Sequence, residues 1–206
     1  METYLSRRKL RRQRGFTLAE TLVALVVLTV GLVGMATLMS QTMSTSSQSD
    51  YMSRAAVLAS EKLEDLNRYP DSDPAVTVPA GNGTAGDLNN DVSQPVTVNG
   101  NTETVDYFDS VQLSSTNGSM LENVVGGAGA GNASNNSTMY KPDGTVVVAV
   151  GPAPPVMGTT MVAFKRRWII EQDQPLAGVK RVTVRVILQT SSDKRVLPFQ
   201  MSMVRP

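Results

Sequence analysis

A single carboxylate, that of Glu20, lies just inside a long apolar segment near the N-terminus of this 206-residue chain. It is the one charged residue in the stretch 16–43, and residues 22–39 carry no charge at all. An ionised carboxylate in apolar surroundings is costly unless a cation meets it. The chemistry that this position indicates is therefore the pairing of Glu20 with a positive charge in a water-poor environment.

The spacing of Asp87, Asn89 and Asp91 matches the first three ligand positions of a calcium-binding loop. However, Val92 stands where such a loop has glycine, and Val98 stands where it has its last acid. We therefore expect an ordinary Asn/Asp turn here and keep the three residues as a weak candidate metal site.

Three consecutive basic residues, Lys165, Arg166 and Arg167, precede the single tryptophan, Trp168. Basic side chains interleaved with aromatic rings can hold nucleic acid, but we favour basic side chains on the solvent face of a strand. The first 15 residues hold six of the 19 Lys and Arg and one of the 18 Asp and Glu, so residues 16–206 hold 13 basic and 17 acidic residues. This mildly acidic balance gives no electrostatic case for a nucleic-acid partner.

The chain contains no histidine and no cysteine. This excludes a Ser-His-Asp triad, a histidine metal site and a disulfide bond. No pair of carboxylates stands in a recognisable catalytic frame. The sequence therefore predicts a protein that is not an enzyme and that holds no cofactor.

The elements that must position these groups begin with a membrane helix. The uncharged run at 22–39 has 18 residues, close to the roughly 20 that span a bilayer core, and the run is long enough when counted from Phe16. Basic residues stand on its N-terminal side only, which places the N-terminus in the cytoplasm. The run is longer than the about 7–15 apolar residues of a secretory signal, and no A-x-A site follows it.

The helix should continue beyond the membrane. Residues 44–49 are rich in Ser and Thr but contain neither Pro nor Gly, and the helical period returns from Tyr51. Because Tyr69 precedes Pro70, the helix should end there. The predicted apolar stripe, which should cover a sheet, consists of Met52, Ala55, Ala56, Ala59, Leu63 and Leu66.

The clearest strands lie at the C-terminus, where apolar residues alternate and turn signals at 175–178 and 191–194 separate three runs. We expect an antiparallel meander with one buried face. The alternating positions are Val162, Phe164, Arg166, Trp168 and Ile170, then Val182, Val184, Val186 and Leu188, then Leu197, Phe199, Met201 and Met203.

Residues 71–145 are predicted to be poor in regular structure, because Gly, Asn, Ser, Thr and Asp dominate them. Gly126–Ser137 should form an exposed loop. The strand candidates in and next to this region are Ala75–Pro79, Pro95–Val98, Thr104–Gln112 and, as a buried strand, Thr145–Val150.

A short basic leader, then Gly15-Phe16-Thr17-Leu18-Ala19-Glu20, then an uninterrupted apolar helix together resemble the class III signal of type IV pilins and pseudopilins. The resemblance implies that prepilin peptidase cuts between Gly15 and Phe16 and methylates the new amino group of Phe16. It also implies that the Glu20 carboxylate of one subunit meets the Phe16 ammonium of its neighbour during assembly. This would satisfy the pairing that Glu20 demands.

The resemblance further implies an α+β fold of the type IV pilin kind, in which a long N-terminal helix packs on an antiparallel head. The expected segments are a leader at 1–15, a membrane and filament-core half-helix at 16–43, an amphipathic half-helix at 44–69 and a head at 70–206. Within the head, we expect residues 70–150 to be loop-rich and residues 151–206 to form the meander.

The amphipathic half-helix and the strings 164–168 and 178–184 resemble minor pilins of the PilV kind and also the I-type minor pseudopilins of type II secretion. The expected function is that of a minor pilin in pilus assembly or priming, and so in adhesion, twitching motility or DNA uptake. Its partners would be prepilin peptidase and other pilins, first in the bacterial inner membrane with a periplasmic head, then in a filament. The alternatives are a minor pseudopilin and an uncleaved, membrane-anchored periplasmic binding domain.

Overall fold

A computed structural model describes residues 17–114, 118–124, 136–150, 161–189 and 198–206. The chain divides into two compact units, Met1–Ser47 and Gln48–Pro206, which are described separately below. One helix, α1 (Leu18–Arg68), contributes to both units. The prediction that the helix continues through the Ser/Thr-rich stretch 44–49 is confirmed, and its end lies one residue before the predicted Tyr69.

In the first unit, the apolar side chains of α1 from Leu18 to Met43 are exposed. By length and composition this part of the helix could cross a membrane, and none of its most apolar window is buried inside the structure. The hydroxyl groups within it are satisfied locally, because Thr29 donates to the carbonyl of Val26 and Thr37 to that of Gly34. The helix therefore offers a lipid or protein neighbour an apolar surface on which these threonines are already hydrogen-bonded.

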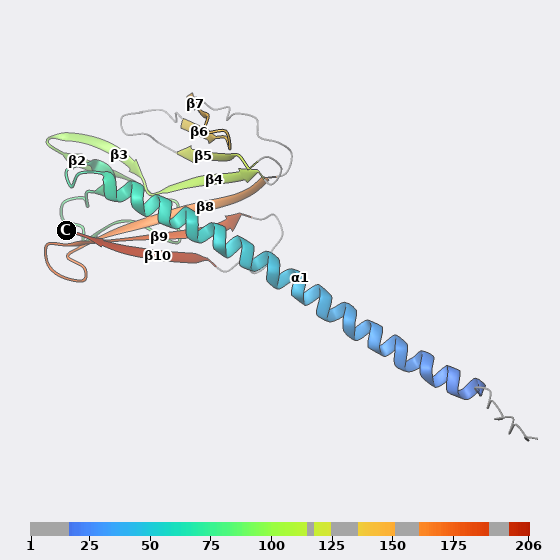
Figure 1. Cartoon of the computed structure of the whole chain (residues 1–206). Coiled ribbons are helices and arrows are strands. Elements are labelled where there is room, and N and C mark those ends of the chain that lie inside the picture. The colour runs from blue at the N-terminus through green and yellow to red at the C-terminus, as the bar shows by residue number, and fades with distance from the viewer. Residues whose placement is uncertain (1–16, 115–117, 125–135, 151–160, 190–197) are drawn as a thin grey trace, which may run out of the picture. The chain divides into compact units, whose positions relative to one another are not determined.

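In the second unit, seven strands of an eight-stranded antiparallel sheet run in the order β10-β9-β8-β4-β5-β6-β7 (Figure 1), and the eighth strand, β1, lies off this order. The long central strand β8 pairs with β4 and β9, and near its C-terminal end also with β1. A separate two-stranded sheet joins β2 and β3. The bounds are a 3-10 helix η1 (Pro74–Val76), β1 (Thr84–Gly86), β2 (Ser93–Val98), β3 (Asn101–Asp106), β4 (Phe108–Ser114), β5 (Met120–Val124), β6 (Asn136–Tyr140), β7 (Val146–Val150), β8 (Met161–Gln172), β9 (Lys180–Gln189) and β10 (Phe199–Arg205).

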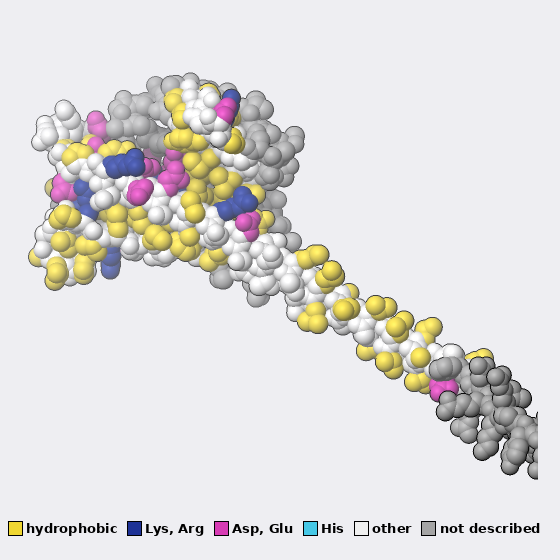
Figure 2. Space-filling view, viewed as in Figure 1, with side chains coloured by type: hydrophobic (Ala, Val, Ile, Leu, Met, Phe, Trp, Pro, Cys, Tyr) yellow, Lys and Arg dark blue, Asp and Glu magenta, His cyan; other side chains and the backbone are white. Residues whose placement is uncertain are grey.

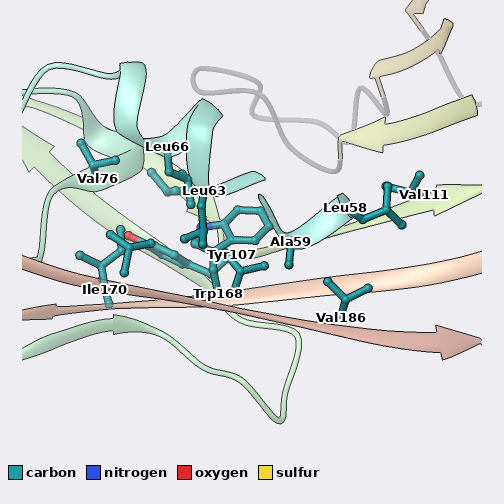
Figure 3. Close-up of a cluster of buried hydrophobic side chains, with 14 of the residues drawn as sticks. Leu58, Ala59, Leu63, Leu66, Val76, Tyr107, Val111, Trp168, Ile170 and Val186 are labelled. Atoms are coloured by element: carbon teal, nitrogen blue, oxygen red, sulfur yellow. The ribbon is translucent and has the colours of Figure 1, made fainter. Parts of the chain in front are cut away.

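The core of this unit lies between the sheet and the second part of α1 (Figure 3). The predicted stripe is confirmed at Ala55, Ala59, Leu63 and Leu66, and Leu58, which the prediction omitted, is also buried. Burial of each leucine contributes about 1.5–3 kcal/mol. The sheet side of this core consists mainly of Val111, Phe164, Trp168, Ile170, Val182, Val184 and Val186.

The predicted C-terminal meander is confirmed as β8, β9 and β10, which pair antiparallel in that order. Its buried face holds the predicted alternating residues of β8 and β9. The predicted turn at 191–194 and the predicted strand residue Leu197 lie outside the described residues.

The prediction that residues 70–150 are loop-rich is wrong, because seven strands fall within them and β4 lies at the centre of the main sheet. The predicted strand Ala75–Pro79 is instead the 3-10 helix η1 followed by extended chain. Much of the predicted loop Gly126–Ser137 lies outside the described residues, but its last two residues begin β6. The predicted buried strand Thr145–Val150 is the edge strand β7, and its first three valines are exposed.

The predicted strand Thr104–Gln112 is divided at Tyr107 between β3 and β4, which belong to different sheets. The amide of Tyr107 donates to the carbonyl of Val92, and its own carbonyl accepts from the amide of Trp168. Gly86 makes this junction possible, because a Cβ there would lie 2.3 Å from the Trp168 carbonyl oxygen and 2.8 Å from Tyr107.

Arg205, the last residue of β10, closes the C-terminal end of α1. Its Nη1 donates to the carbonyl of Leu66 and its Nη2 to the carbonyl of Tyr69, each at 2.7 Å. Asp71 accepts a second contact from Nη2 at 3.1 Å. A buried cation at the negative end of the helix dipole, bonded to carbonyls that the helix leaves unpaired, stabilises that end.

Arg205→Met is expected to lower the free energy of unfolding by about 2–4 kcal/mol, because two charge-assisted bonds to carbonyls at the helix end are lost, of which the bond to Leu66 is buried. The measurement is urea unfolding of the full chain in detergent, followed by the fluorescence of the single tryptophan, Trp168. Arg54→Met is the control, because among the described residues Arg54 pairs with exposed Asp50 alone, one helical turn away. It should cost about 0.3–0.5 kcal/mol, and an equal loss in both variants would contradict the capping role.

Candidate functional site

The N-terminal segment of α1 begins with a capping box formed by Thr17 and Glu20. The amide of Glu20 donates to the hydroxyl oxygen of Thr17 at 3.3 Å, and the amide of Thr17 donates to the Glu20 carboxylate at 3.5 Å. This reciprocal arrangement satisfies two amides that a helix start leaves unpaired. Gly15 and Phe16, the predicted cleavage residues, lie outside the described residues.

The capping box explains where the Glu20 side chain is held in the isolated chain. It is exposed, at the start of an exposed apolar helix, and its partner is a neutral amide of its own backbone. A weak contact of this kind leaves the carboxylate able to accept a stronger bond from an incoming cation. The local signal for this contact is the Thr-x-x-Glu signature of a capping box, which the sequence carries at Thr17 and Glu20.

The head contains a buried ionic network around Asp109 of β4. Its carboxylate accepts from Arg166 Nε at 2.6 Å and Nη2 at 2.7 Å, and from the Lys62 ammonium at 3.0 Å. Arg166 Nη2 also reaches the Glu122 carboxylate of β5. Asp109 and Arg166 have fully buried side chains. The network therefore joins α1 to β4, β5 and β8.

Lys62 is the helix residue of this network, and its ammonium lies 4.3 Å from the centroid of the Trp168 ring. It thus contacts a carboxylate and an aromatic face at once, which favours one rotational setting of α1 on the sheet. Burial raises the pKa of Asp109, but Lys62 and Arg166 outweigh it and hold that pKa below its usual value. The carboxylate is therefore ionised at neutral pH.

The prediction of a solvent-facing basic run at Lys165, Arg166 and Arg167 is wrong for its middle residue. Arg166 shares the buried face with Phe164 and Trp168, because side chains alternate along β8. Lys165 and Arg167 lie on the opposite face, where both pair with Asp91. The three basic side chains thus do not form one patch.

The candidate calcium loop is bound to that opposite face of the sheet. Asp91 accepts from Lys165 and Arg167, and the Asn89 side-chain oxygen accepts from Arg185 of β9. Asp87 accepts from the amide of Asn89 at 2.7 Å, as in an Asx turn. The oxygens that would ligate a cation are therefore engaged with basic side chains or backbone. The described residues contain no cluster of three or more acidic ligands that could hold a metal ion.

Glu61 of α1 lies beside the network and forms no salt bridge with a described residue. Burial raises the pKa of Glu61, Arg166 opposes the rise, and the carboxylates of Glu122, Asp65 and Asp109 add to it. The folded state therefore holds this proton more tightly than the unfolded chain does. The stability that protonated Glu61 contributes is present below its ordinary pKa of 4.5 and is lost as the pH rises through the folded-state value.

Glu61→Gln is expected to raise the urea midpoint of the full chain at neutral pH and to remove the gain that acidification toward pH 4.5 gives the natural chain. The midpoint is measured at a series of pH values in this window. Glu64→Gln is the control, because Glu64 is exposed on the same helix. If the two variants show the same pH dependence, the assignment to Glu61 fails.

Comparison with known proteins bears on the N-terminal segment. The model of a family described as the prokaryotic N-terminal methylation motif matches residues 10–36. No curated protein and no solved structure matches the chain. The matched residues include Gly15, Phe16 and Glu20, so the chain carries a class III prepilin-type signal of pilin-like proteins. The helix and antiparallel sheet are consistent with the α+β fold of type IV pilins.

Proposed function

We propose that this chain is a minor pilin of a type IV pilus. Prepilin peptidase cuts it between Gly15 and Phe16 and methylates the amino group of Phe16. The first part of α1 then anchors the protein in the inner membrane of a bacterium, with the head in the periplasm, until the helix packs with those of other pilins in a filament.

The observation that carries this proposal is the combination of the methylation motif with an apolar helix whose surface is exposed from Leu18 to Met43. Exposed apolar area of this extent needs a lipid or protein environment. The motif accounts for a lipid environment first and a protein environment afterwards. Such a signal implies processing at the membrane and then a context of pilin assembly. Within the described residues, no cluster of acidic metal ligands competes with a structural role.

The proposed location of the head outside the cytoplasm rests on charge. Six basic residues precede the apolar helix within the first 15 residues. Positive charge next to a membrane helix stays on the cytoplasmic side. The N-terminus would therefore meet the peptidase at the cytoplasmic surface, and the chain after Met43 would be translocated.

Glu20 is proposed to set the register of assembly. After cleavage, Phe16 carries a free ammonium four residues before this carboxylate. Neither ion is stable alone among packed apolar helices, so the carboxylate of one subunit and the ammonium of the next would pair. The capping contact with Thr17 holds Glu20 at the helix start, near the point where a neighbour's N-terminus would arrive.

The experiment that tests the proposal is intact mass and N-terminal analysis of the protein from membranes and from sheared filaments. A chain that begins with N-methyl-Phe16 supports the proposal. A Gly15→Leu variant should remain uncut, because the residue before the cut no longer fits the motif. A natural chain that begins with Met1 in a host with active prepilin peptidase would overturn it in favour of an uncleaved anchored domain.

One observation favours a second candidate, since the amphipathic half-helix pattern at 54–66 also resembles I-type minor pseudopilins of type II secretion. Deletion of the gene separates the two. Loss of surface pili with normal export of secreted proteins supports the PilV-like minor pilin that primes or modifies a pilus. Loss of protein export with normal pili supports the pseudopilin.

A further inference from the structure

The main sheet extends beyond the helix that covers it. Val111 of β4 is buried beneath α1, and strand register places Glu122, Thr138 and Val148 in line with it on β5, β6 and β7. Residues directly opposite one another share a face. This row therefore continues the core face of the sheet outward, from a fully buried valine to Val148, which is 63% exposed.

A second row on the same face is apolar along its length. Leu113 and Met120 are half-buried, Tyr140 is 37% exposed, and Val146 is 53% exposed. Figure 2 shows apolar side chains gathered over β6 and β7, with acidic side chains close by. We call the face formed by Met120, Tyr140, Val146 and Val148 the β5–β7 face.

The border between this face and α1 is acidic. Tyr140 has its pKa raised by burial and by the nearby carboxylates of Glu122, Glu61 and Asp65. Together with Asp109, these make four carboxylates. Among the described residues, two cations lie close to them, Lys62 and Arg166. Both cations already pair with Asp109 or Glu122. Glu61 and Asp65 form no salt bridge with a described residue, so two negative charges remain at the border.

The β6–β7 turn does not offset this excess. It contains Lys141 and Asp143, which are exposed and of opposite charge. The burial that raises the pKa of Glu61 already makes its ionised form costly, and an added positive charge would relieve that cost. An occupant of the face is thus favoured if it brings a cation to the border and apolar atoms to the valines.

We propose that the β5–β7 face docks the head of a neighbouring filament subunit that presents an arginine or lysine beside apolar side chains. The apolar part covers Tyr140, Val146 and Val148, and the cation lies between Glu61 and Asp65. The site rests on the proposed function, because a filament is what brings heads together. It adds to that function a contact between heads, distinct from the packing of N-terminal helices.

The first test compares Val148→Asp with Val204→Asp in cells that make the full chain. Val204 is the matched control, because it is 54% exposed and lies on β10, the opposite edge strand of the same sheet. Val148→Asp is expected to reduce the amount of the chain in sheared filaments about tenfold, which corresponds to about 1.4 kcal/mol. Val204→Asp should leave it within about twofold of the natural chain, that is, within about 0.4 kcal/mol.

The second test addresses the charge. Asp65→Lys should reduce incorporation in the same way, whereas Glu64→Lys, one residue away and exposed, should not. A photo-crosslinking residue at position 148 should join the head of another subunit at a peptide that contains Arg or Lys next to an apolar residue. Protease resistance of the head in each variant shows that it is folded.

The outcomes separate the two proposals. If Val148→Asp and Val204→Asp enter filaments equally, or if the crosslinked peptide contains no Arg or Lys, the docking proposal is overturned and the pilin function stands. If intact mass from the same samples shows an uncut natural chain, the pilin function is overturned and the docking proposal falls with it.

Discussion

Asp109→Asn is expected to lower the free energy of unfolding by about 3–5 kcal/mol. The substitution keeps the size of the side chain but removes the charge that Lys62 and Arg166 share. Arg166 would remain buried with only Glu122 as a charged partner. Since a typical domain is stable by about 5–15 kcal/mol, the head should be largely unfolded in mild denaturant.

Asp91→Asn is the matched control, because Asp91 also accepts from two cations, Lys165 and Arg167. Its side chain is 34% exposed, whereas that of Asp109 is fully buried. Water screens the exposed cluster, so the loss should stay below about 1 kcal/mol. Urea unfolding followed by Trp168 fluorescence measures both variants, and similar losses would refute the assignment of stability to the buried network.

Glu20→Gln is expected to reduce entry of the chain into filaments by more than about tenfold, while cleavage at Gly15 continues. The lost energy is that of an ion pair between packed helices, which exceeds the about 1.4 kcal/mol of a tenfold change. Glutamine also serves at this position of a capping box, so the helix start is preserved and only the charge is removed. The readout is the ratio of the chain in sheared filaments to the chain in membranes.

Thr17→Ala is the complementary variant, because it removes the capping hydroxyl and keeps the Glu20 charge. It should cost about 1 kcal/mol of local helix stability and reduce incorporation far less. If Thr17→Ala blocks assembly and Glu20→Gln does not, the capping contact is the essential feature of this segment and the intersubunit pair is refuted.

The parts of the fold that the sequence predicts are those in which periodicity and burial agree. In β8 and β9 one alternating set of residues faces the core, and all of its members except Arg166 are apolar, so the pattern predicts the meander. The stripe of α1 was found in the same way. The end of the helix followed from Pro70, since the residue before a proline avoids the helical region.

Strands β5 and β6 were not predicted, and β4 was predicted only as part of Thr104–Gln112, because polar residues occupy buried positions in these three strands for a physical reason. Asp109 and Glu122 occupy core positions as members of an ionic network, and Ser137 is buried in β6. A prediction based on alternating apolar residues therefore fails at the core positions that these charged residues occupy. The same network explains why the prediction of a solvent-facing Arg166 is wrong. Its side chain shares the buried face of β8 with Phe164 and Trp168, and a charged residue is expected on such a face only when it has ionic partners there.

The residues of the candidate site were likewise only partly predictable from the sequence. The proposed cleavage and methylation residues, Gly15 and Phe16, stand in a contiguous motif, so the sequence alone indicates them. The network of Lys62, Asp109 and Arg166 joins residues up to 104 positions apart in the sequence, and no local spacing shows that they meet. In the sequence, Glu61 and Asp65 are simply charged residues off the apolar stripe of the helix, and their place beside Tyr140 depends on how far the sheet extends beyond α1.

The bond between Arg205 and the Leu66 carbonyl spans 139 residues and joins the next-to-last residue of the chain to an element made early. Contacts so distant in sequence form late and slow the folding of the domain that needs them. The carbonyls at the end of α1 are therefore satisfied only once β10 has joined the sheet. A chain without β10 would keep the helix and most of the sheet, yet the Leu66 and Tyr69 carbonyls would lose their bonds to Arg205. Strand β10 thereby couples the end of the helix to formation of the sheet, so that neither is finished without the other.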